Sequence, residues 1–494
     1  MLLLGIDLGT SSIKVSVVDG STGSTIASAN YPESEAPILS DHSGWAEQDP
    51  QSWWDYTKQA IKKVNSTGLY NSKDIGAIGI AYQMHGLVIV DKDQQVLRNS
   101  IIWCDSRAVE LGNEAFEALA PNGFLQSHLN SPGNFTASKL AWVKRNEPQV
   151  YQRIDKFMLP GDYLSMCLTG EINSNISSLS EGVFWNFEKN ALSRELLSYY
   201  DIDEALVPEN HPVFSNYGSV RAEVAAELGL SSKAIVAYKA GDQPNNALSL
   251  NVLEPGEVAS TAGTSGVIYA VSDQLVYDKL SRVNTFAHIN HKHNKPNLGV
   301  LLCINGTGIQ NSWMKGVTAP GLSYPQINAA AAEIPIGSRG LRILPFGNGA
   351  ERMLCNRTVG AHIENIDFVH HTQAHLWRAA QEGIAFSFRY GLDIMRENGI
   401  NPAVIKAGYA NLFLSEVFQQ SFAGVTNVPV QLYDNDGSVG AALGAGLGAS
   451  AFTNRQEAFA GMKQNGQVEP SNMALYEELY GQWKESLENK LKNK

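Results

Sequence analysis

The stretch of sequence that decides the fold reads LLLGIDLGTSSIKVSVVD and covers residues 2–19. Its apolar run Leu2–Asp7 leads into a Gly-Thr-Ser-Ser turn, and Ile13–Asp19 then alternates apolar with polar side chains. A further short run follows at Ser24–Tyr31. Short runs of this kind, joined by tight turns, are typical of neighbouring antiparallel strands. The sequence therefore predicts that the chain opens with a three-stranded antiparallel meander.

Helix and strand patterns alternate after the meander. Trp53–Val64 is predicted to be helical, with Asp49-Pro50 as its lead-in. Ile75–Ala81 is an apolar run typical of a buried strand, and shorter strands are predicted at Val88–Asp91 and Ser100–Trp103. A meander followed by such alternation indicates an α/β fold.

The opening pattern of strand, Gly/Thr/Ser turn and strand recurs about 250 residues later. There the predicted strands are Gly256–Ala262, Val267–Val271 and Leu298–Ile304, and the predicted helices are His371–Asn398, Leu412–Gly424, Gly437–Ser450 and Pro470–Lys494. A chain of 494 residues has room for two to four domains of roughly 100–200 residues each. We therefore expect two domains of similar architecture, residues 1–250 and 251–494, packed against each other without a low-complexity linker.

Composition excludes several classes of protein. The 37 Lys and Arg residues against 49 Asp and Glu give a formal net charge of −12, which argues against broad binding of nucleic acid. No run of 18 apolar residues predicts a membrane span, and no signal-peptide pattern opens the chain. The four cysteines lie far apart without a CxxC pair, so we expect a reduced, cytoplasmic protein.

The two Gly/Thr/Ser turns are candidate phosphate-binding sites. Glycine admits close backbone approach, and hydroxyl and N–H groups donate to phosphate oxygens. In the first turn the candidates are Gly9, Thr10, Ser11 and Ser12, with Lys14 on the returning strand and Asp7 as a carboxylate for Mg²⁺ held through water. The second turn offers Gly263, Thr264 and Ser265. Each turn alone is also explained as an ordinary hairpin, but two in matching positions can clamp one phosphate chain between them.

Asp242 is the candidate general base. It follows the apolar run Ile235–Ala240 and precedes a helix predicted to start near Pro244. A carboxylate at the carboxyl end of a strand, beside a helix N-terminus, suits a base that faces a cleft. The alternative is an aspartate that only caps the helix.

Two strand ends carry candidate sugar-binding residues. Met84 and His85 follow the buried strand 75–81, and Trp103 and Asp105 follow the strand 100–103. An aromatic face beside hydrogen-bonding groups is suited to a polyol. The alternatives are a structural histidine and a tryptophan that packs in the core.

Taken together, seven segments resemble the FGGY carbohydrate kinases over nearly the whole chain, most closely the xylulokinases of that family. The segments, in order, are IDLGTSSIKVSVVD, GWAEQDPQSWW, GIAYQMHGLVIVDKDQQVLRNSIIWCDSR, FTASKLAWVKRNEP, DKFMLPGDYLSMCLTGE, GDQ at 241–243 and AGTSGVIYAV. The resemblance implies two ribonuclease H-like domains of the actin, sugar-kinase and heat-shock ATPase superfamily, with ATP between them. It also implies a sugar site in the N-terminal domain and the adenine side in the C-terminal domain.

The resemblance also implies roles for single residues. It makes Asp242 the base and assigns Met84 and His85 to the sugar site, while Gln243 beside the base is similar to glycerol-kinase-like relatives. Asp7 corresponds to the aspartate near Mg²⁺ and ATP. The positions that correspond to the nucleotide cleft are Gly9–Lys14, Gly263–Ser265, Gly306, Gln310, Gly408 and Asn411.

Three segments depart from the usual pattern of the family. The glycine loop near adenine becomes Ala407–Leu412, the segment before the base reads Ala240-Gly241-Asp242-Gln243-Pro244, and a Ser-Gly-Glu-Arg loop becomes Asn348–Arg352. The expected reaction is ATP-dependent, Mg²⁺-assisted phosphorylation of D-xylulose to D-xylulose 5-phosphate, which feeds xylose into the pentose phosphate pathway. The alternatives are a kinase for another pentulose or polyol, such as ribulose, and a non-catalytic sugar or nucleotide sensor. A homodimer is one possible assembly, and no nucleic-acid or membrane partner is expected.

Overall fold

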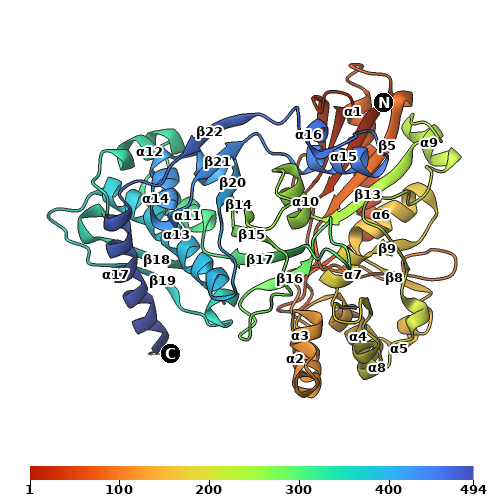
Figure 1. Ribbon diagram of the computed structural model, residues 1–494, viewed down its shortest axis with the longest axis horizontal. Coiled ribbons are helices and arrows are strands. Elements are labelled where there is room, and N and C mark those ends of the chain that lie inside the picture. Colours follow the sequence, from red (N-terminus) through yellow and green to blue (C-terminus); the bar gives the residue numbers. More distant parts are fainter. Residues whose placement is uncertain (493–494) are drawn as a thin grey trace.

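A computed structural model describes residues 1–492 and has two lobes, each built on one central β-sheet (Figure 1). The lobe formed mainly by the first half of the chain lies on the right of Figure 1, and the other lies on the left. Within residues 1–492, no helix combines the length and apolar character needed to cross a membrane.

The first sheet confirms the predicted meander. Its strand order is β13-β5-β1-β2-β3. The antiparallel strands are β1 (Leu2–Leu8), β2 (Ile13–Asp19) and β3 (Thr25–Tyr31), and β5 (Ile75–Tyr82) and β13 (Ile235–Gly241) continue the sheet in parallel from β1. β1 and β5 are almost wholly buried because helices cover both faces of the sheet.

The second sheet repeats this plan. Its order is β16-β17-β15-β14-β20-β21-β22, with β14, β15 and β17 antiparallel and β14, β20 and β21 parallel. Reading β21-β20-β14-β15-β17 therefore reproduces the order and directions of β13-β5-β1-β2-β3, which confirms the predicted recurrence. The strands are β14 (Glu257–Ala262), β15 (Gly266–Ser272), β16 (Asn284–Ala287), β17 (Leu298–Ile304), β20 (Val404–Gly408), β21 (Val430–Tyr433) and β22 (Gln464–Val468).

One helix of the second half lies on the sheet of the first. α15 (Gly437–Gly448) packs on β1, β5 and β13, and Figure 1 shows it in blue among the red strands. A Cβ added to Gly5 would lie 1.7 Å from the carbonyl oxygen of Ser438, and one on Gly79 would lie 1.9 Å from that of Ala441. Glycine at both positions lets the helix backbone sit directly on the sheet. The division of the chain at residue 250 stays a prediction, and in space the first lobe also contains α15.

Most predicted helices are present, with shifted ends. α1 (Pro50–Asn65) begins after Asp49, whose side chain accepts the N–H of Gln51. α14 (Glu416–Thr426) begins later than predicted because Asn411–Leu414 forms a 3₁₀ turn. α13 (Gln373–Glu397) and α17 (Met473–Lys492) match the two longest predicted helices, and residues 493–494 of the latter lie outside the described part.

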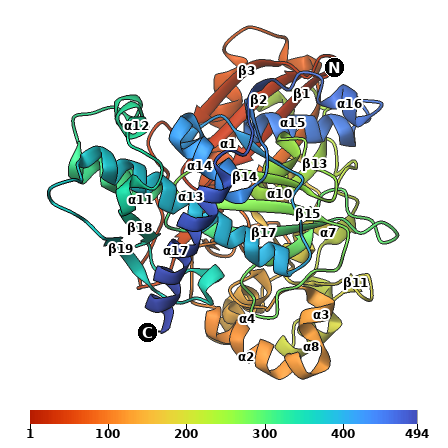
Figure 2. The same ribbon diagram turned by 60° about the vertical axis from the view of Figure 1, so that its left-hand side comes forward.

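Shorter elements surround the two sheets (Figure 2). The strands predicted at Val88–Asp91 and Ser100–Trp103 are shorter than expected, Val88–Val90 and Ser100–Ile101, so Trp103 lies in the loop beyond its strand. The remaining helices are α2 (Val109–Leu119), α3 (Phe124–His128), α4 (Thr136–Asn146), α5 (Pro148–Tyr151), α6 (Pro160–Thr169), α7 (Ile176–Glu181), α8 (Arg194–Tyr200), α9 (Ala222–Leu228), α10 (Asp242–Ser249), α11 (Gly308–Thr318), α12 (Tyr324–Ala332) and α16 (Arg455–Ala458). The remaining strands are β4 (Glu47–Gln48), β8 (Lys156–Met158), β9 (Asn173–Asn175), β10 (Trp185–Asn186), β11 (Ala191–Leu192), β12 (Glu209–His211), β18 (Arg342–Phe346) and β19 (Gly360–Glu364).

Candidate active site

The first predicted phosphate turn joins β1 to β2 and is tight. The N–H of Gly9 donates to the carbonyl oxygen of Ser12 at 3.1 Å, and the strand register places Asp7 opposite Lys14. Lys14 forms an ion pair with Asp436, the residue that caps the N-terminus of α15. The turn therefore lies between the ends of two central strands of the first sheet and a helix N-terminus that comes from the other half of the chain.

Asp7 lies against the start of α15. A Cβ on Gly437 would lie 2.1 Å from Oδ2 of Asp7, so only glycine leaves room for the carboxyl group there. Burial and the charge of Asp436 raise the pKa of Asp7 to about 6, although Lys14 acts in the opposite direction. A nearby cation would favour the charged form of this carboxyl group and so lower its pKa.

The predicted base, Asp242, is the first residue of α10. Gly241 is the N-cap residue and makes no side-chain bond, so the alternative of an aspartate N-cap does not describe this helix. Burial and the charge of Asp7 raise the pKa of Asp242 to about 7, while hydrogen bonds from Gln243 oppose the shift. A partly buried carboxylate with a pKa near neutrality is suited to accept a proton.

Gln243 and His85 present buried polar atoms without a partner in the described part of the chain. These atoms are Oε1 of Gln243 and Nδ1 of His85. Burial, together with the charges of Lys139 and Arg352, lowers the pKa of His85 to about 3, so its imidazole is neutral. Unpaired buried polar atoms are rare in folded proteins and are expected where a ligand binds.

The turn that carries Met84 and His85 packs closely against the segment before the base. A Cβ on Gly241 would lie 2.6 Å from Cγ of Met84. The ring of His85 lies 4.8 Å from the ring of Phe135 and 5.5 Å from that of Phe286, centroid to centroid. Met84 thus lies beside the residue that directly precedes the predicted base.

Trp103 and Asp105 differ in their surroundings. Trp103 is 52% exposed, and its indole N–H donates to Oγ1 of Thr10 at 2.9 Å. This bond links the loop of Trp103 and Asp105 to the first phosphate turn. Asp105 is fully buried and accepts bonds from the N–H of Ala46 at 2.6 Å and from the guanidinium of Arg107 at 2.6–3.0 Å. Asp105 therefore fixes the loop that carries Trp103, and the contact with sugar predicted for Asp105 stays a prediction.

The second predicted turn, in the other lobe, is held by backbone bonds. The N–H of Gly308 donates to the carbonyl oxygen of Gly263 at 2.9 Å, and the N–H of Ile309 to that of Thr264 at 3.1 Å. A Cβ on Gly263 would lie 3.6 Å from Nδ2 of Asn411. The structure thus brings the turn, the start of α11 and the loop after β20 together.

The other predicted nucleotide residues belong to the same cluster. Gly306 lies so close to the chain that a Cβ would be 1.7 Å from the carbonyl oxygen of Pro345. Oε1 of Gln310, in the first turn of α11, is buried without a partner in the described residues. Ser265 completes the turn, and Gly408 ends β20 just before Asn411. All of these positions lie in the second lobe.

Three buried side chains around the site, Gln48, Lys139 and Glu181, are not among the residues predicted from the sequence. Gln48 donates to the carbonyl oxygen of Thr10 at 2.8 Å and accepts from Nε2 of Gln83 at 2.9 Å, which ties the first turn to the end of β5. Lys139 and Glu181 both bond to the backbone of His85. In sequence, a lysine on α4 and a glutamate at the end of α7 resemble solvent-facing residues, so no local signal marks them.

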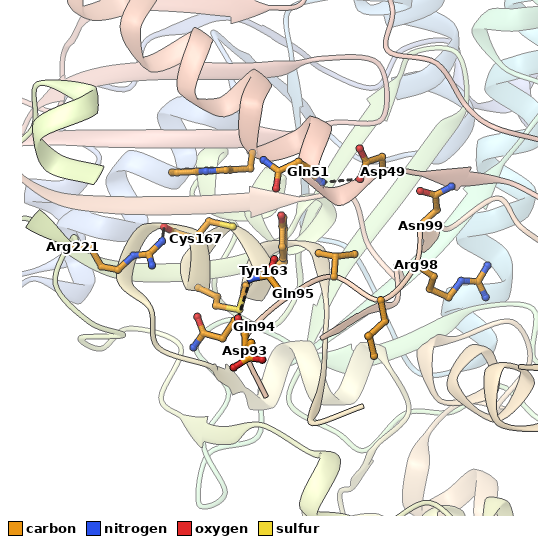
Figure 3. A pocket seen from close by; sticks show the side chains of 14 residues that line it. Asp49, Gln51, Asp93, Gln94, Gln95, Arg98, Asn99, Tyr163, Cys167 and Arg221 are labelled. Atoms are coloured by element: carbon orange, nitrogen blue, oxygen red, sulfur yellow. Dashed lines mark hydrogen bonds between the residues drawn. The ribbon is translucent and has the colours of Figure 1, made fainter. Parts of the chain in front are cut away.

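Two cavities lie near these elements. One of about 550 Å³ is lined by Asp49, Tyr163, Arg221 and neighbours, and none of the predicted site residues lines it (Figure 3). Another, of about 500 Å³, lies between the lobes, with Ser28 and Asp436 on the side of the first lobe and Tyr409 on the side of the second. Because Asp436 pairs with Lys14, the second cavity adjoins the first turn.

The carboxyl group of Asp7 suits a metal ion that arrives together with a nucleotide. Within residues 1–492, no three His, Cys, Asp or Glu side chains form a group that could hold a metal. Mg²⁺ usually keeps several waters and takes one or two carboxylates together with substrate phosphates. The partly buried carboxyl group of Asp7, beside the phosphate turn, fits that mode.

Comparison with known proteins identifies the family. Residues 2–249 match the N-terminal domain of the FGGY family of carbohydrate kinases, and residues 258–450 match its C-terminal domain. The chain therefore belongs to the FGGY family of carbohydrate kinases and is an enzyme of that class. Members of the family use ATP and a sugar.

Individual relatives are similar to this chain over nearly its full length. The xylulose kinase of Staphylococcus epidermidis is 31% identical over 98% of this chain and 97% of its own. The solved xylulose kinase of Rhodospirillum rubrum is 28% identical, covers 99% of both chains and superimposes with a TM-score of 0.87. Glycerol kinase of Plasmodium falciparum, at 19% identity and a TM-score of 0.89 over 99% of this chain and 98% of its own, shares the fold. The predicted two-domain architecture of the sugar-kinase superfamily is confirmed.

Proposed function

We propose that this kinase transfers the γ-phosphoryl group of ATP to the terminal hydroxyl of D-xylulose and forms D-xylulose 5-phosphate. The observation that carries the proposal is the position of Asp242. Its partly buried carboxyl group has a pKa of about 7, raised by burial and by the charge of Asp7 beside the phosphate turn. Asp242 also directly follows Gly241, which packs against Met84. The choice of sugar is supported by the xylulose kinases among the relatives.

In the proposed reaction, Asp242 accepts the proton of the sugar hydroxyl while the hydroxyl oxygen bonds to the γ-phosphorus. The bond from that phosphorus to the β–γ bridging oxygen breaks, and ADP leaves with its electron pair. General-base help of this kind is typically worth about 10²–10⁴-fold. Most of the remaining acceleration is expected from alignment and charge stabilisation.

The first turn and its neighbours are proposed to provide that charge stabilisation. Lys14 and the N–H groups of Thr10–Ser12 would approach the phosphates beside Gly9, whose own N–H closes the turn, and Asp7 would hold the hydrated Mg²⁺ that accompanies ATP. Bound Mg²⁺ offsets part of the charge that develops on the phosphate oxygens. Gly263–Ser265, Gly306, Gln310, Gly408 and Asn411 are proposed to hold the nucleotide from the opposite lobe.

His85, Met84, Trp103 and Gln243 are proposed to bind the sugar. The neutral imidazole of His85 and the amide of Gln243 each have a buried atom free to bond a hydroxyl group. Trp103 offers an exposed aromatic face. These groups are suited to a neutral polyol because they carry no net charge.

The test is a panel of sugars with ADP release as the readout. We expect the highest kcat/KM with D-xylulose, and lower values with D-ribulose, L-ribulose and glycerol. A higher value for ribulose or glycerol would replace the proposed substrate but keep the kinase. ATP binding without ADP release on any sugar would instead favour a sensor.

A further inference from the structure

The backbone of His85 is held on both sides by buried ionisable side chains. His85 adopts a left-handed conformation with φ of 63°. Its N–H donates to Oε1 of Glu181 at 3.0 Å, and its carbonyl oxygen accepts from Nζ of Lys139 at 2.7 Å. A left-handed conformation is uncommon for a residue other than glycine and persists only where its surroundings fix it.

Lys139 links the two strand ends of the predicted sugar site. Its side chain is fully buried in the first lobe, and Nζ also donates to the carbonyl oxygen of Ile102 at 3.0 Å. Ile102 directly precedes Trp103. One ammonium group therefore ties the His85 turn to the Trp103 loop, and its removal would leave two buried carbonyl groups without this donor.

Glu181 links the same turn to the base. Oε2 accepts from the hydroxyl of Tyr82 at 3.4 Å and would lie 2.8 Å from a Cβ on Gly241, the residue before Asp242. The hydrogen bonds described for this carboxyl group all use it as an acceptor. An amide of the same shape can accept the same backbone bond, whereas a methyl group cannot.

We infer that Lys139 and Glu181 are positioning residues that fix the Met84–His85 turn relative to Trp103 and Asp242, and thereby set the affinity for sugar rather than for ATP. The inference rests on the proposed function, because it takes that turn as the sugar site. Both side chains belong to the first lobe, on α4 and α7, whereas the predicted turn at Gly263–Ser265 lies in the second.

The test compares Lys139→Met, Glu181→Ala and Glu181→Gln with the wild type. We expect the first two to raise KM for the sugar by about 10-fold or more, since each removes a buried hydrogen bond to the turn. KM for ATP is expected to stay within about twofold of the wild-type value, because neither variant removes a bond to the residues proposed to hold the nucleotide. Glu181→Gln is expected to restore sugar KM to nearly the wild-type value.

Lys239→Met is the matched control. Lys239 is another fully buried lysine of the first lobe, but it bonds Asn173 at 2.7 Å and Asp162 at 2.7 Å, which are not predicted site residues. We expect this variant to lower Tm without a selective rise in sugar KM. The inference is overturned if Lys239→Met gives the same selective rise, if Lys139→Met raises both KM values equally, or if Glu181→Gln is as damaging as Glu181→Ala.

A second readout separates this inference from the proposed function. Wild-type turnover on the sugar panel decides the function by itself. In protein labelled with ¹⁵N-histidine, the amide signal of His85, assigned with a His85→Gln variant, reports the bond to Glu181 directly. We expect that signal to move in Glu181→Ala but not in Lys239→Met, whatever sugar the enzyme uses, and an unmoved signal in Glu181→Ala overturns the inference.

Discussion

The two glycine turns occupy equivalent places in sheets of the same strand order, yet their surroundings differ. The turn at Gly9–Ser12 is ringed by ionisable groups, with Asp7 below it and the Lys14–Asp436 ion pair beside it. The turn at Gly263–Ser265 is held by backbone bonds from Gly308 and Ile309. The same topology thus supports a charged site in one lobe and a backbone cradle in the other.

This difference suggests a division of labour in a duplicated fold. Charged groups crowded in a buried place shift one another's pKa values, as Asp7 does to Asp242, and so are suited to proton transfer and metal binding. A backbone cradle has no titratable group and is suited to hold a nucleotide by shape and hydrogen bonding. Changes to the charged groups beside the first turn should therefore affect turnover, and changes at the second turn should affect the KM for ATP.

The largest expected effect is on turnover in Asp242→Asn. The amide keeps the shape of the side chain but cannot accept the hydroxyl proton, so kcat should fall by about 10²–10⁴-fold. KM for ATP should change little, because Asp242 lies among the charged groups near the first turn and not at the second turn, which is expected to hold the nucleotide. The assay is ADP release at saturating sugar and MgATP, and near-normal turnover would refute the assignment of the base.

The backbone cradle is tested by Gly308→Ala. The added Cβ would lie 2.2 Å from the carbonyl oxygen of Gly263, so the bond that joins the second turn to α11 must give way. We expect KM for ATP to rise by about 10-fold while sugar KM is retained, in line with the loss of one well-placed binding contact. Gly316→Ala is the control, because no atom lies within 4 Å of a Cβ at that position of the same helix. Equal effects of the two variants would contradict the role of the cradle.

Local patterns in the sequence were enough to predict the meander and its repetition. The alternation in Ile13–Asp19 and the apolar run before Gly9 report which faces are buried, and the same pattern reappears at β14 and β15. The docking of α15 on β1 could not be predicted, because the contact joins Gly5 to Ser438, more than 400 positions apart in the sequence. Its only trace in β1 is Gly5, which one sequence cannot distinguish from any other glycine in a strand.

The candidate site was predictable where chemistry lies at strand ends and turns. Asp242, His85 and Lys14 lie at such places. In the structure Asp7, which pairs with Lys14 across the strands, is close enough to Asp242 to shift its pKa, and Met84, next to His85, packs against Gly241. The environment of Asp105 was not predictable, because its partners Arg107 and Ala46 become visible only when the loop folds. Burial of a lysine such as Lys139 likewise depends on long-range packing rather than on its own helix.

A smaller effect is expected in the pH dependence of the reaction. Because burial and Asp7 raise the pKa of Asp242 to about 7, the base becomes protonated as pH falls through that value. The kcat/KM for the sugar should therefore fall about tenfold per pH unit below neutrality, as it does for a single essential base. The measurement is the pH profile between pH 5 and 9 at constant ionic strength. An acidic limb that appears only below pH 5 would contradict the raised pKa.

The smallest expected effect is on stability, and it runs opposite to the effect on turnover. In metal-free protein the carboxyl group of Asp242 has a pKa of about 7, well above its ordinary 3.8, so the folded state holds its proton more tightly than the unfolded state. The stability that protonation gives is complete below about 3.8, declines as pH rises, and is lost above 7. At pH 8, Asp242→Asn removes the buried charge and should raise Tm by a few degrees, and the gain should shrink toward pH 5, where the wild-type carboxyl group is itself neutral. The measurement is thermal unfolding in EDTA at the two pH values. If the Tm difference between Asp242→Asn and the wild type were the same at both pH values, its cause would be packing or hydrogen bonding at α10. The charge of Asp242 beside Asp7 would then not be what costs the first lobe stability.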